Sequence, residues 1–501
     1  MQTSDQNQVS VIGGGLGGIS AALSLALEGY DVTLFEKNEK VGGKLNTLSM
    51  NGHVFDLGPS ILTLPHIFAR TFEKAGKRME DYVDLCTIRP HWRNFFEDGK
   101  VIDLYPEPDR MAAEAEKAGE PAGNVRKFLA YSQRLYDLVS KGYFEEGLDT
   151  AQDFRSFYGL WNFLKFDLFR SMHGSVKRHF KTAYFRNIFD YFIKYVGSSA
   201  YRAPAFMNCI PHIQFGFDLW YVKGGMYGLA LGLEKLMREL GIHIVLNAEV
   251  QQIIRSADGR SVRGIRMADG TEIPSKIVVS NMDVLPTYRR LLGESEAQLG
   301  KKRKRLEPAC SGLVIDIGLD CRYENLAHHN FIFSRDQKRH FHDVFRKHQL
   351  PRDPTLYVVA ASRTDPAVAP AGCDTLKILP HVPYIDPDRP VSHEDYVALK
   401  DAALEKLERV ACPGLRKHIV VEHFWTPRDI EQQYYSNGGS IYGVVSDRFK
   451  NLAFKAPKMC PKYRGLYFVG GSVNPGGGMP MTFLCGQNVA KVIVKNDRDG
   501  R

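Results

Sequence analysis

Apolar and polar positions divide the first forty residues into a strand, a helix and a second strand. Val9 to Ile12 form a short apolar run typical of a buried strand. Ile19 to Glu28 then carry apolar residues at helical spacing, and Gly29 ends that helix. A second apolar run, Val32 to Phe35, predicts another buried strand. The pattern therefore predicts a βαβ unit.

The turn between the first strand and the helix has the spacing of a dinucleotide-binding turn, Gly13-x-Gly15-x-x-Gly18. Gly13 allows the tight turn, Gly15 lets a pyrophosphate approach the backbone, and Gly18 lets the helix pack closely on the sheet. The helix N-terminus offers free N–H groups to the phosphates. Such a turn alone also fits a plain glycine-rich loop, but the flanking strands and helix favour a dinucleotide.

Glu36 ends the second strand, where a carboxylate can accept hydrogen bonds from both ribose hydroxyls of an adenosine. The same carboxylate would repel a ribose phosphate, which argues against NADP. The cofactor-binding residues predicted in this unit are Val11, Ile12, Gly13, Gly14, Gly15, Leu16, Gly17, Gly18, Ile19 and Glu36.

The residues after Glu36 favour FAD over NAD. A second glycine turn, Val41-Gly42-Gly43-Lys44, is followed by the segment Gly52 to Ser60, which contains Asp56-Leu57-Gly58-Pro59. Together these resemble the flavin-binding amine oxidase and phytoene desaturase superfamily. The resemblance implies that Gly43 and Lys44 wrap the flavin pyrophosphate, and that the backbone of Val250 holds the adenine.

The pattern further along predicts a hairpin at 91–105, a mainly helical stretch at 107–211, and a return to alternating strands and helices from 218. Near the end, a strand at 465–469 leads into Gly470 and Gly471, and a helix covers about 482–495. Many FAD enzymes place an Asp on the ribityl chain where Gly471 stands here. The helix N-terminus near Met479 can still face the pyrimidine edge of the flavin.

Charge and composition exclude some classes of protein. The 66 Lys and Arg exceed the 57 Asp and Glu by nine, and no basic stripe with stacking aromatics accompanies a nucleic-acid motif. We therefore expect no nucleic-acid partner, and a cationic face toward anionic lipid explains the excess equally well. The eight scattered cysteines form no C-x-x-C pair, as expected of reduced thiols in a cytosolic protein.

Two further stretches leave alternatives open. Trp161 to Arg170 is rich in Phe and Leu and has basic neighbours, so it predicts either an interfacial helix that dips into a membrane or a core helix of the helical region. In the first case Phe163, Leu164 and Phe166 would enter the lipid. His328 and His329 are adjacent and point apart on a strand, so we predict no metal site.

The whole chain is similar to the carotenoid desaturase and oxygenase family, and within it to the branch of diaponeurosporene and diapolycopene oxygenases. The segments that carry this resemblance are 55–63, 191–199, 326–331, 440–445 and 468–481. The resemblance implies an α/β fold, in which an FAD-binding Rossmann-type domain is joined to a substrate domain and an inserted helical, membrane-facing domain. The expected divisions are FAD-binding parts at 1–105, 218–304 and 426–501, a helical, membrane-facing and substrate part at 106–217, and a substrate domain at 305–425.

Three functions remain open at this point. The resemblance implies an FAD-dependent oxygenase that uses dioxygen to convert a terminal methyl group of a thirty-carbon carotenoid to an aldehyde. A desaturase on the same scaffold would only remove hydrogens. A non-enzymatic isoprenoid-binding protein of the GDP-dissociation-inhibitor type would not need to keep the glycine turns and Glu36. Because Met1 to Gln8 is polar and no apolar run spans a bilayer, we expect a cytoplasmic protein associated peripherally with a membrane lipid surface.

Overall fold

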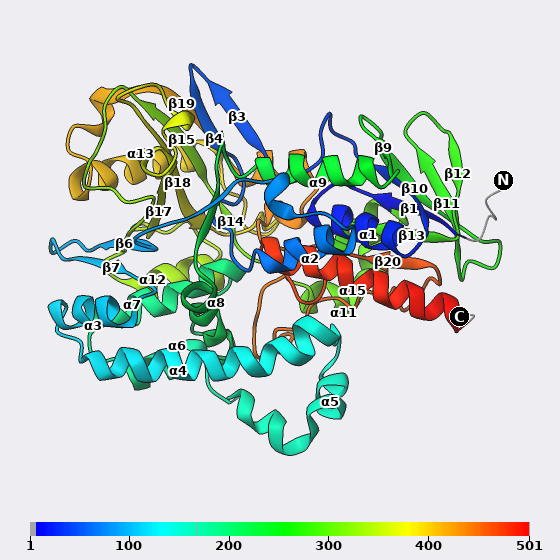
Figure 1. The fold of residues 1–501 in the computed structure, drawn as a ribbon, viewed down its shortest axis with the longest axis horizontal. Coiled ribbons are helices and arrows are strands. Elements are labelled where there is room, and N and C mark those ends of the chain that lie inside the picture. Colours follow the sequence, from blue (N-terminus) through cyan, green and yellow to red (C-terminus); the bar gives the residue numbers. More distant parts are fainter. Residues whose placement is uncertain (1–6, 168, 500–501) are drawn as a thin grey trace.

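Two β-sheets and a helical region build the protein (Figure 1). The computed structural model describes residues 7–167 and 169–499, without the side chains of residues 160, 161, 163 and 164. Figure 1 shows the two sheets beside each other, with the helical region below the second sheet. Both described ends of the chain lie next to the first sheet.

The first sheet is parallel and contains the predicted βαβ unit. Its strand order is β20-β13-β1-β2-β9. The strands are β1 (Gln8–Ile12), β2 (Asp31–Phe35), β9 (His243–Val245), β13 (Ile277–Ser280) and β20 (Leu466–Phe468). Helices α1 (Leu16–Leu27), α9 (Gly228–Glu239) and α15 (Met479–Arg498) accompany this sheet.

Helices α1 and α15 pack closely because small residues meet between them. A Cβ atom on Gly486 of α15 would lie 2.6 Å from the carbonyl oxygen of Gly17. This contact holds the two helices, one from each end of the chain, against the same sheet. The predicted strand, helix and strand are thus confirmed, as is the C-terminal helix.

A three-stranded antiparallel meander lies beside the first sheet, as the turns at Asp258-Gly259 and Asp269-Gly270 predict. Its strands are β10 (Val250–Arg255), β11 (Val262–Met267) and β12 (Glu272–Pro274).

The second sheet is mostly antiparallel and runs β19-β15-β18-β17-β16-β6-β7, with β14 pairing beside β18. Its strands are β6 (Trp92–Phe95), β7 (Val101–Leu104), β14 (Ser311–Gly312), β15 (Val314–Leu319), β16 (His329–Ile332), β17 (Leu356–Ala360), β18 (Asp374–Val382) and β19 (Ile419–Trp425). Helix α13 (His393–Val410) buries Leu399, Leu404 and Leu407 in a core shared with Ile315 and Ile378 of this sheet.

The predicted hairpin of β6 and β7 is confirmed, and it belongs to the second sheet. β6 pairs in parallel with β16, so that Phe331 lies opposite Asn94. The divisions expected at residues 105, 217, 304 and 425 stay predictions, but the hairpin shows that the first segment of the chain contributes to both sheets.

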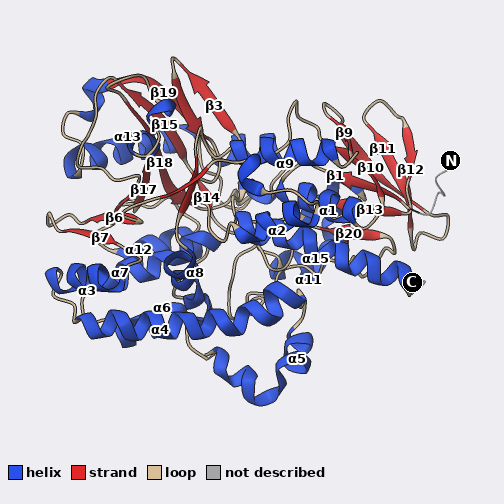
Figure 2. Ribbon diagram, in the orientation of Figure 1, coloured by secondary structure: helices blue, strands red, loops and turns tan. Residues whose placement is uncertain are grey.

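The region from Pro108 to Phe217 is helical, as predicted (Figure 2). Its helices are α3 (Pro108–Lys117), α4 (Ala122–Val139), α5 (Ala151–Phe163), α6 (Met172–His179), α7 (Ala183–Tyr191) and α8 (Ile210–Phe217). The rings of Phe128, Phe180 and Phe189 form its core, with centroids 4.7–4.9 Å apart. The shorter connecting elements are β3 (Thr47–Met50), β4 (His53–Asp56), α2 (His66–Lys74), β5 (Leu85–Thr87), β8 (Trp220–Val222), α11 (Glu296–Arg305), α12 (Gln337–His342) and α14 (Pro427–Tyr434).

The stretch proposed as an interfacial helix is only partly described, because the side chains of residues 161, 163 and 164, and all of residue 168, lie outside the described set. Phe166 is 2% exposed and packs against Phe154 and Tyr158, so its predicted insertion into lipid is wrong. Phe169, three residues later, is 84% exposed. In the part of the chain that the structure describes, no helix is both long and apolar enough to cross a membrane.

Candidate functional site

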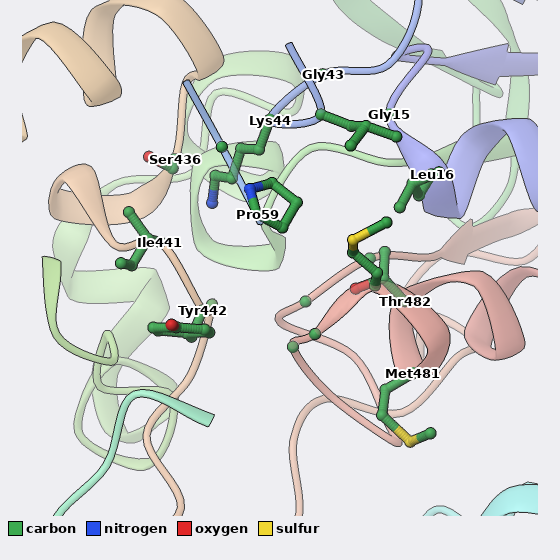
Figure 3. Close-up of a pocket in the computed structure, with 18 of the residues that line it drawn as sticks. Gly15, Leu16, Gly43, Lys44, Pro59, Ser436, Ile441, Tyr442, Met481 and Thr482 are labelled. Carbon is green, nitrogen blue, oxygen red and sulfur yellow. The ribbon is translucent and has the colours of Figure 1, made fainter. Parts of the chain in front are cut away.

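A cavity of about 380 Å³ lies between the two sheets and receives residues from distant parts of the chain. Figure 3 shows Leu16, Met481 and Thr482 on one side of it, and Ile441 and Tyr442 on the other. The first group belongs to α1 and α15 on the first sheet. The cavity therefore connects the predicted dinucleotide turn to the predicted substrate region.

The turn from β1 into α1 has the geometry that its glycines predict. Gly13 has φ +94°, and its N–H donates to the carbonyl oxygen of Phe35 at 2.8 Å. A Cβ on Gly18 would lie 2.1 Å from the carbonyl oxygen of Gly13, so only glycine fits there. No side chain caps the N-terminus of α1, and Gly15 and Leu16 line the cavity. Uncapped N–H groups at a helix start are suited to bind an anion.

Glu36 is buried at the end of β2 and lines the cavity. Its carboxylate accepts hydrogen bonds from the backbone N–H of Gly14 at 2.7 Å, and from the backbone N–H and side-chain amide of Asn38 at 2.9 and 2.7 Å. These three donors fix the carboxylate beside the glycine turn, where it has further lone pairs to accept hydrogen bonds.

The second glycine turn closes over the first. The N–H of Gly42 donates to the carbonyl oxygen of Gly14 at 2.7 Å, and a Cβ on Gly43 would lie 3.0 Å from the Cα of Gly15. Lys44 follows, and its ammonium group donates to the carbonyl oxygen of Ser440 at 2.7 Å. Burial lowers the pKa of Lys44. The amine of Lys44 thus lies between the second glycine turn and the segment that contains Ser440, on the opposite side of the cavity (Figure 3).

The C-terminal segment supplies a second uncapped helix start. Gly470 and Gly471 follow β20 and line the cavity, and α15 begins at Met479 without a side-chain cap. Gly471 provides no carboxylate, so the polar contribution of this segment comes from the backbone at the start of α15. Val250, the first residue of β10 in the antiparallel meander, also lines the cavity.

The structure brings most of the predicted cofactor residues to the cavity and leaves five behind it. Those that line it are Ile12, Gly13, Gly15, Leu16, Glu36, Gly43, Lys44, Val250, Gly470, Gly471 and Met479. The other five pack or position the turn and do not line the cavity: Val11, Gly14, Gly17, Gly18 and Ile19.

Asn281 is a site residue that the sequence patterns did not single out. Its backbone N–H donates to the carbonyl oxygen of Ile12, and its side chain lines the cavity beside the glycine turn. A Cβ on Gly15 or on Gly17 would lie 2.6 Å from its side-chain amide. The only signal in the sequence is its place directly after a buried strand, which does not reveal that this strand neighbours β1.

The wall opposite the glycine turns is aromatic, with a few polar groups. Tyr195 donates a hydrogen bond to Gln214 at 2.8 Å, and the hydroxyl of Tyr357 is 3.0 Å from Nδ1 of His329. Burial raises the pKa of Tyr195 and of Tyr357 well above the usual value, so both remain protonated. Lys377 also lines this wall and donates to the carbonyl oxygen of Gly58.

The two adjacent histidines are buried, and their rings do not point apart. Their centroids are 4.4 Å apart. Nδ1 of His328 lies 2.7 Å from the hydroxyl of Thr364, and His329 bonds to Tyr357. Burial lowers the pKa of both imidazoles, so they are neutral hydrogen-bonding groups inside the second sheet. The prediction that the two rings point apart is therefore wrong.

A parallel sheet with a glycine turn, a buried carboxylate and two uncapped helix starts on one cavity is typical of a dinucleotide-binding protein. Residues 16–494 match the model of a protein family described as flavin containing amine oxidoreductase. The chain belongs to this family, and it is an FAD-dependent oxidoreductase.

Similar proteins and solved structures are consistent with membership of this family. The chain is 54% identical to a 4,4'-diapolycopene oxygenase of Methylomonas sp, over 99% of each chain. It is 45% identical to a 4,4'-diaponeurosporene oxygenase of Staphylococcus haemolyticus, over 97% of each chain. Its fold resembles that of a putrescine oxidase, with a TM-score of 0.64 at 15% identity, over 98% of this chain and 99% of the other.

Proposed function

We propose that this protein is an FAD-dependent carotenoid oxygenase, which oxidises a terminal methyl group of an acyclic thirty-carbon carotenoid to an aldehyde in a staphyloxanthin-type pathway. The observation that carries the proposal is the full-length identity of 54% to a diapolycopene oxygenase and 45% to a diaponeurosporene oxygenase. The cavity supports it, because one wall suits a dinucleotide and the other suits an apolar chain.

The residues of the first wall fit FAD. In this proposal the start of α1 at Gly15 and Leu16 holds the pyrophosphate, and Glu36 accepts the ribose hydroxyls. The start of α15 at Met479 faces the flavin ring, where its uncapped N–H groups favour negative charge. When bound, FAD supplies the redox chemistry with dioxygen, and the protein supplies position and the electrostatic environment.

The second wall suits a polyene, which has no ionisable group. Phe206, Ile210, Ile213 and Leu379 line it, and burial of apolar surface contributes about 25 cal/mol per Å² to holding such a substrate. This apolar wall also excludes water from the reacting end. The uncharged hydroxyl of Tyr195 beside Gln214 can contact an oxygen atom introduced there.

Labelled dioxygen tests the reaction. The purified enzyme, supplied with an acyclic carotenoid in lipid and with ¹⁸O₂, should yield a terminal aldehyde that carries the label in freshly quenched product. A product that only loses hydrogens, and forms equally well without air when a quinone accepts the electrons, would establish the desaturase instead. A purified protein that shows no flavin absorbance would favour the non-enzymatic isoprenoid-binding alternative.

We also propose that the protein binds a membrane surface through a patch made by two exposed rings, Phe169 and Phe449, and two half-buried arginines, Arg202 and Arg448. Phe169 is 84% and Phe449 66% exposed. The guanidinium groups of Arg202 and Arg448 lie 4.5 and 4.6 Å from the ring centroid of Phe449. Two exposed aromatic rings flanked by cations are suited to an anionic lipid interface.

The patch lies close to the cavity. Arg448 donates a hydrogen bond to the carbonyl oxygen of Phe169 at 3.3 Å, so the segments that carry Phe169 and Phe449 contact each other. Phe206 lines the cavity and contacts Phe166, three residues before Phe169. A water-insoluble substrate could therefore pass from lipid to the cavity over a short distance.

Vesicle flotation tests the patch. Because burying a Phe side chain contributes about 1.5–3 kcal/mol, the double variant Phe169→Ser/Phe449→Ser should bind anionic vesicles at least about a hundredfold more weakly. Leu231 and Val420 are each 52% exposed elsewhere, so Leu231→Ser/Val420→Ser is a matched control that should bind as the wild type does. If both double variants bind vesicles equally well, the patch is not the membrane-binding surface.

A further inference from the structure

The amine of Lys194 lies in a cage of four aromatic rings on the second wall of the cavity. Its Nζ is 5.0 Å from the ring centroid of Trp92, 4.3 Å from that of Tyr195, 4.9 Å from that of Phe331 and 4.3 Å from that of Tyr357. The rings come from three strands and one helical turn, so the cage is built by the tertiary fold.

Lys194 has no acidic partner among the residues that the structure describes, and no hydrogen bond or ion pair reaches its Nζ there. The side chain is 5% exposed, yet it lines the cavity. Burial alone lowers the pKa of Lys194 well below its usual value. Burial therefore favours the neutral amine over the ammonium form, and a neutral amine is a nucleophile toward carbonyl carbons.

The cage lies beside the end of the cavity where oxidation is proposed to occur. A Cβ on Gly478 would lie 3.7 Å from the carbonyl oxygen of Tyr195, and Gly478 directly precedes Met479 at the start of α15. Tyr195 is the neighbour of Lys194 in sequence and also forms part of its cage. The turn that carries Lys194 thus lies beside the start of α15, where the aldehyde is proposed to form, and the Lys194 side chain lines the same cavity.

We propose that Lys194 is a covalent binding site for the terminal aldehyde of a polyene. This inference rests on the proposed function, because it takes that reaction's product as the ligand. The Nζ lone pair forms a C–N bond to the carbonyl carbon while the C–O π bond breaks and its oxygen takes up a proton. The carbinolamine then loses water and leaves an imine, with both amine protons carried away overall in the water and no change in redox state.

The surroundings stabilise such an imine. Four ring faces attract a protonated imine as they would an ammonium group. The same rings limit the access of water, which would hydrolyse it. The hydroxyls of Tyr195 and Tyr357 lie on the same wall and can hydrogen-bond to the carbinolamine oxygen before it leaves as water.

Borohydride trapping tests the site without turnover. The purified holoenzyme is incubated with all-trans-retinal as the probe, reduced with sodium borohydride, digested and mapped by mass spectrometry. We expect the adduct on the peptide that contains Lys194, at roughly ten times or more the yield on exposed lysines, because the cavity holds the polyene beside this amine and burial favours its neutral form. Equal labelling of exposed lysines, or no label on Lys194, overturns the proposal.

Two variants sharpen the test. Lys194→Met fills the cage with an uncharged side chain and should abolish the specific adduct. Lys235→Met removes an exposed lysine whose Nζ also lies over a ring, 4.5 Å from the centroid of Tyr82, and should leave the adduct unchanged. Because retinal is added from outside, trapping can fail while ¹⁸O-labelled aldehyde is still produced, which would refute this site alone. Trapping with no aldehyde product in the oxygenation assay would instead refute the proposed function.

Discussion

Alanine at Gly15 and at Gly18 should separate cofactor binding from folding. Gly15 has φ −74°, which alanine adopts without strain, and the one close neighbour of the added methyl group would be the side-chain amide of Asn281, at 2.6 Å, with the Cα of Gly43 at an ordinary contact distance of 4.0 Å. That amide can rotate away from the methyl group, but it would then enter the cavity that is proposed to hold FAD. Gly15→Ala should therefore fold and bind FAD less tightly. Gly18→Ala instead places a methyl group 2.1 Å from the carbonyl oxygen of Gly13, which is backbone.

The expected magnitudes follow from these two contacts. For Gly18→Ala the helix must move away from β1, and overpacking of this kind costs about 1–3 kcal/mol or more of unfolding free energy. For Gly15→Ala we expect a stability loss of about 0.5–1.5 kcal/mol, which is the range for one side chain moved out of its rotamer. Its affinity for FAD should fall at least about tenfold, equivalent to 1.4 kcal/mol.

The assay combines thermal unfolding of the apoprotein with FAD titration followed by flavin fluorescence. Gly123→Ala, in α4, is the control, because nothing lies within 4 Å of its added methyl group. This control should be as stable as the wild type or slightly more stable. Full flavin affinity in Gly15→Ala, or a Gly18→Ala protein as stable as the wild type, would show that these glycines do not have the roles assigned to them.

Two further predictions concern Glu36 and Asp56. Glu36→Gln removes a buried charged acceptor of three hydrogen bonds. Because hydrogen bonds to a charged group contribute about 1.5–3 kcal/mol, isothermal titration should show that the affinity for FAD is lowered roughly ten- to a hundredfold. Unchanged affinity would show that Glu36 does not bind the cofactor. Burial raises the pKa of Asp56 from 3.8 to about 6, although the charge of Lys377 opposes this shift. The folded state therefore binds this proton more tightly than the unfolded chain does, and the resulting stability is lost as the pH rises through about 6. The stability of Asp56→Asn relative to the wild type, measured by thermal unfolding, should therefore increase between about pH 4 and pH 7. A difference in stability that stays constant across this range would contradict the prediction.

The first βαβ unit could be predicted because every signal for it is local. The apolar runs, the glycine spacing and Glu36 all lie within about forty residues, and the structure forms them as expected. Asn281 could not be found in this way. It reaches the glycine turn because β13 pairs with β1, and a pairing between strands so far apart in sequence leaves no local pattern.

Burial was the other quantity that local patterns misjudged. Phe166 lies in an apolar, basic-flanked stretch that fits lipid insertion as well as core packing. Its contacts with Phe154 and Tyr158 settle the choice, and both partners belong to a neighbouring helix. The backbone of Phe169 is hydrogen-bonded to Arg448, which is 279 positions away along the chain. An amphipathic pattern indicates that some face is apolar but does not show which neighbour covers it.

The two walls of the cavity impose different demands on the sequence. The first holds its ligand mainly through backbone groups, so it constrains residues to be small, as at Gly13, Gly15 and Gly43. The second holds its ligand through side chains from the second sheet and the helical region, and these can change without disturbing the glycine turns. Lys194 belongs to this second wall, with its cage drawn from Trp92, Phe331 and Tyr357. In the proposed function, the redox chemistry therefore depends on the first wall, whereas the choice of substrate and the fate of its oxidised end depend on the second.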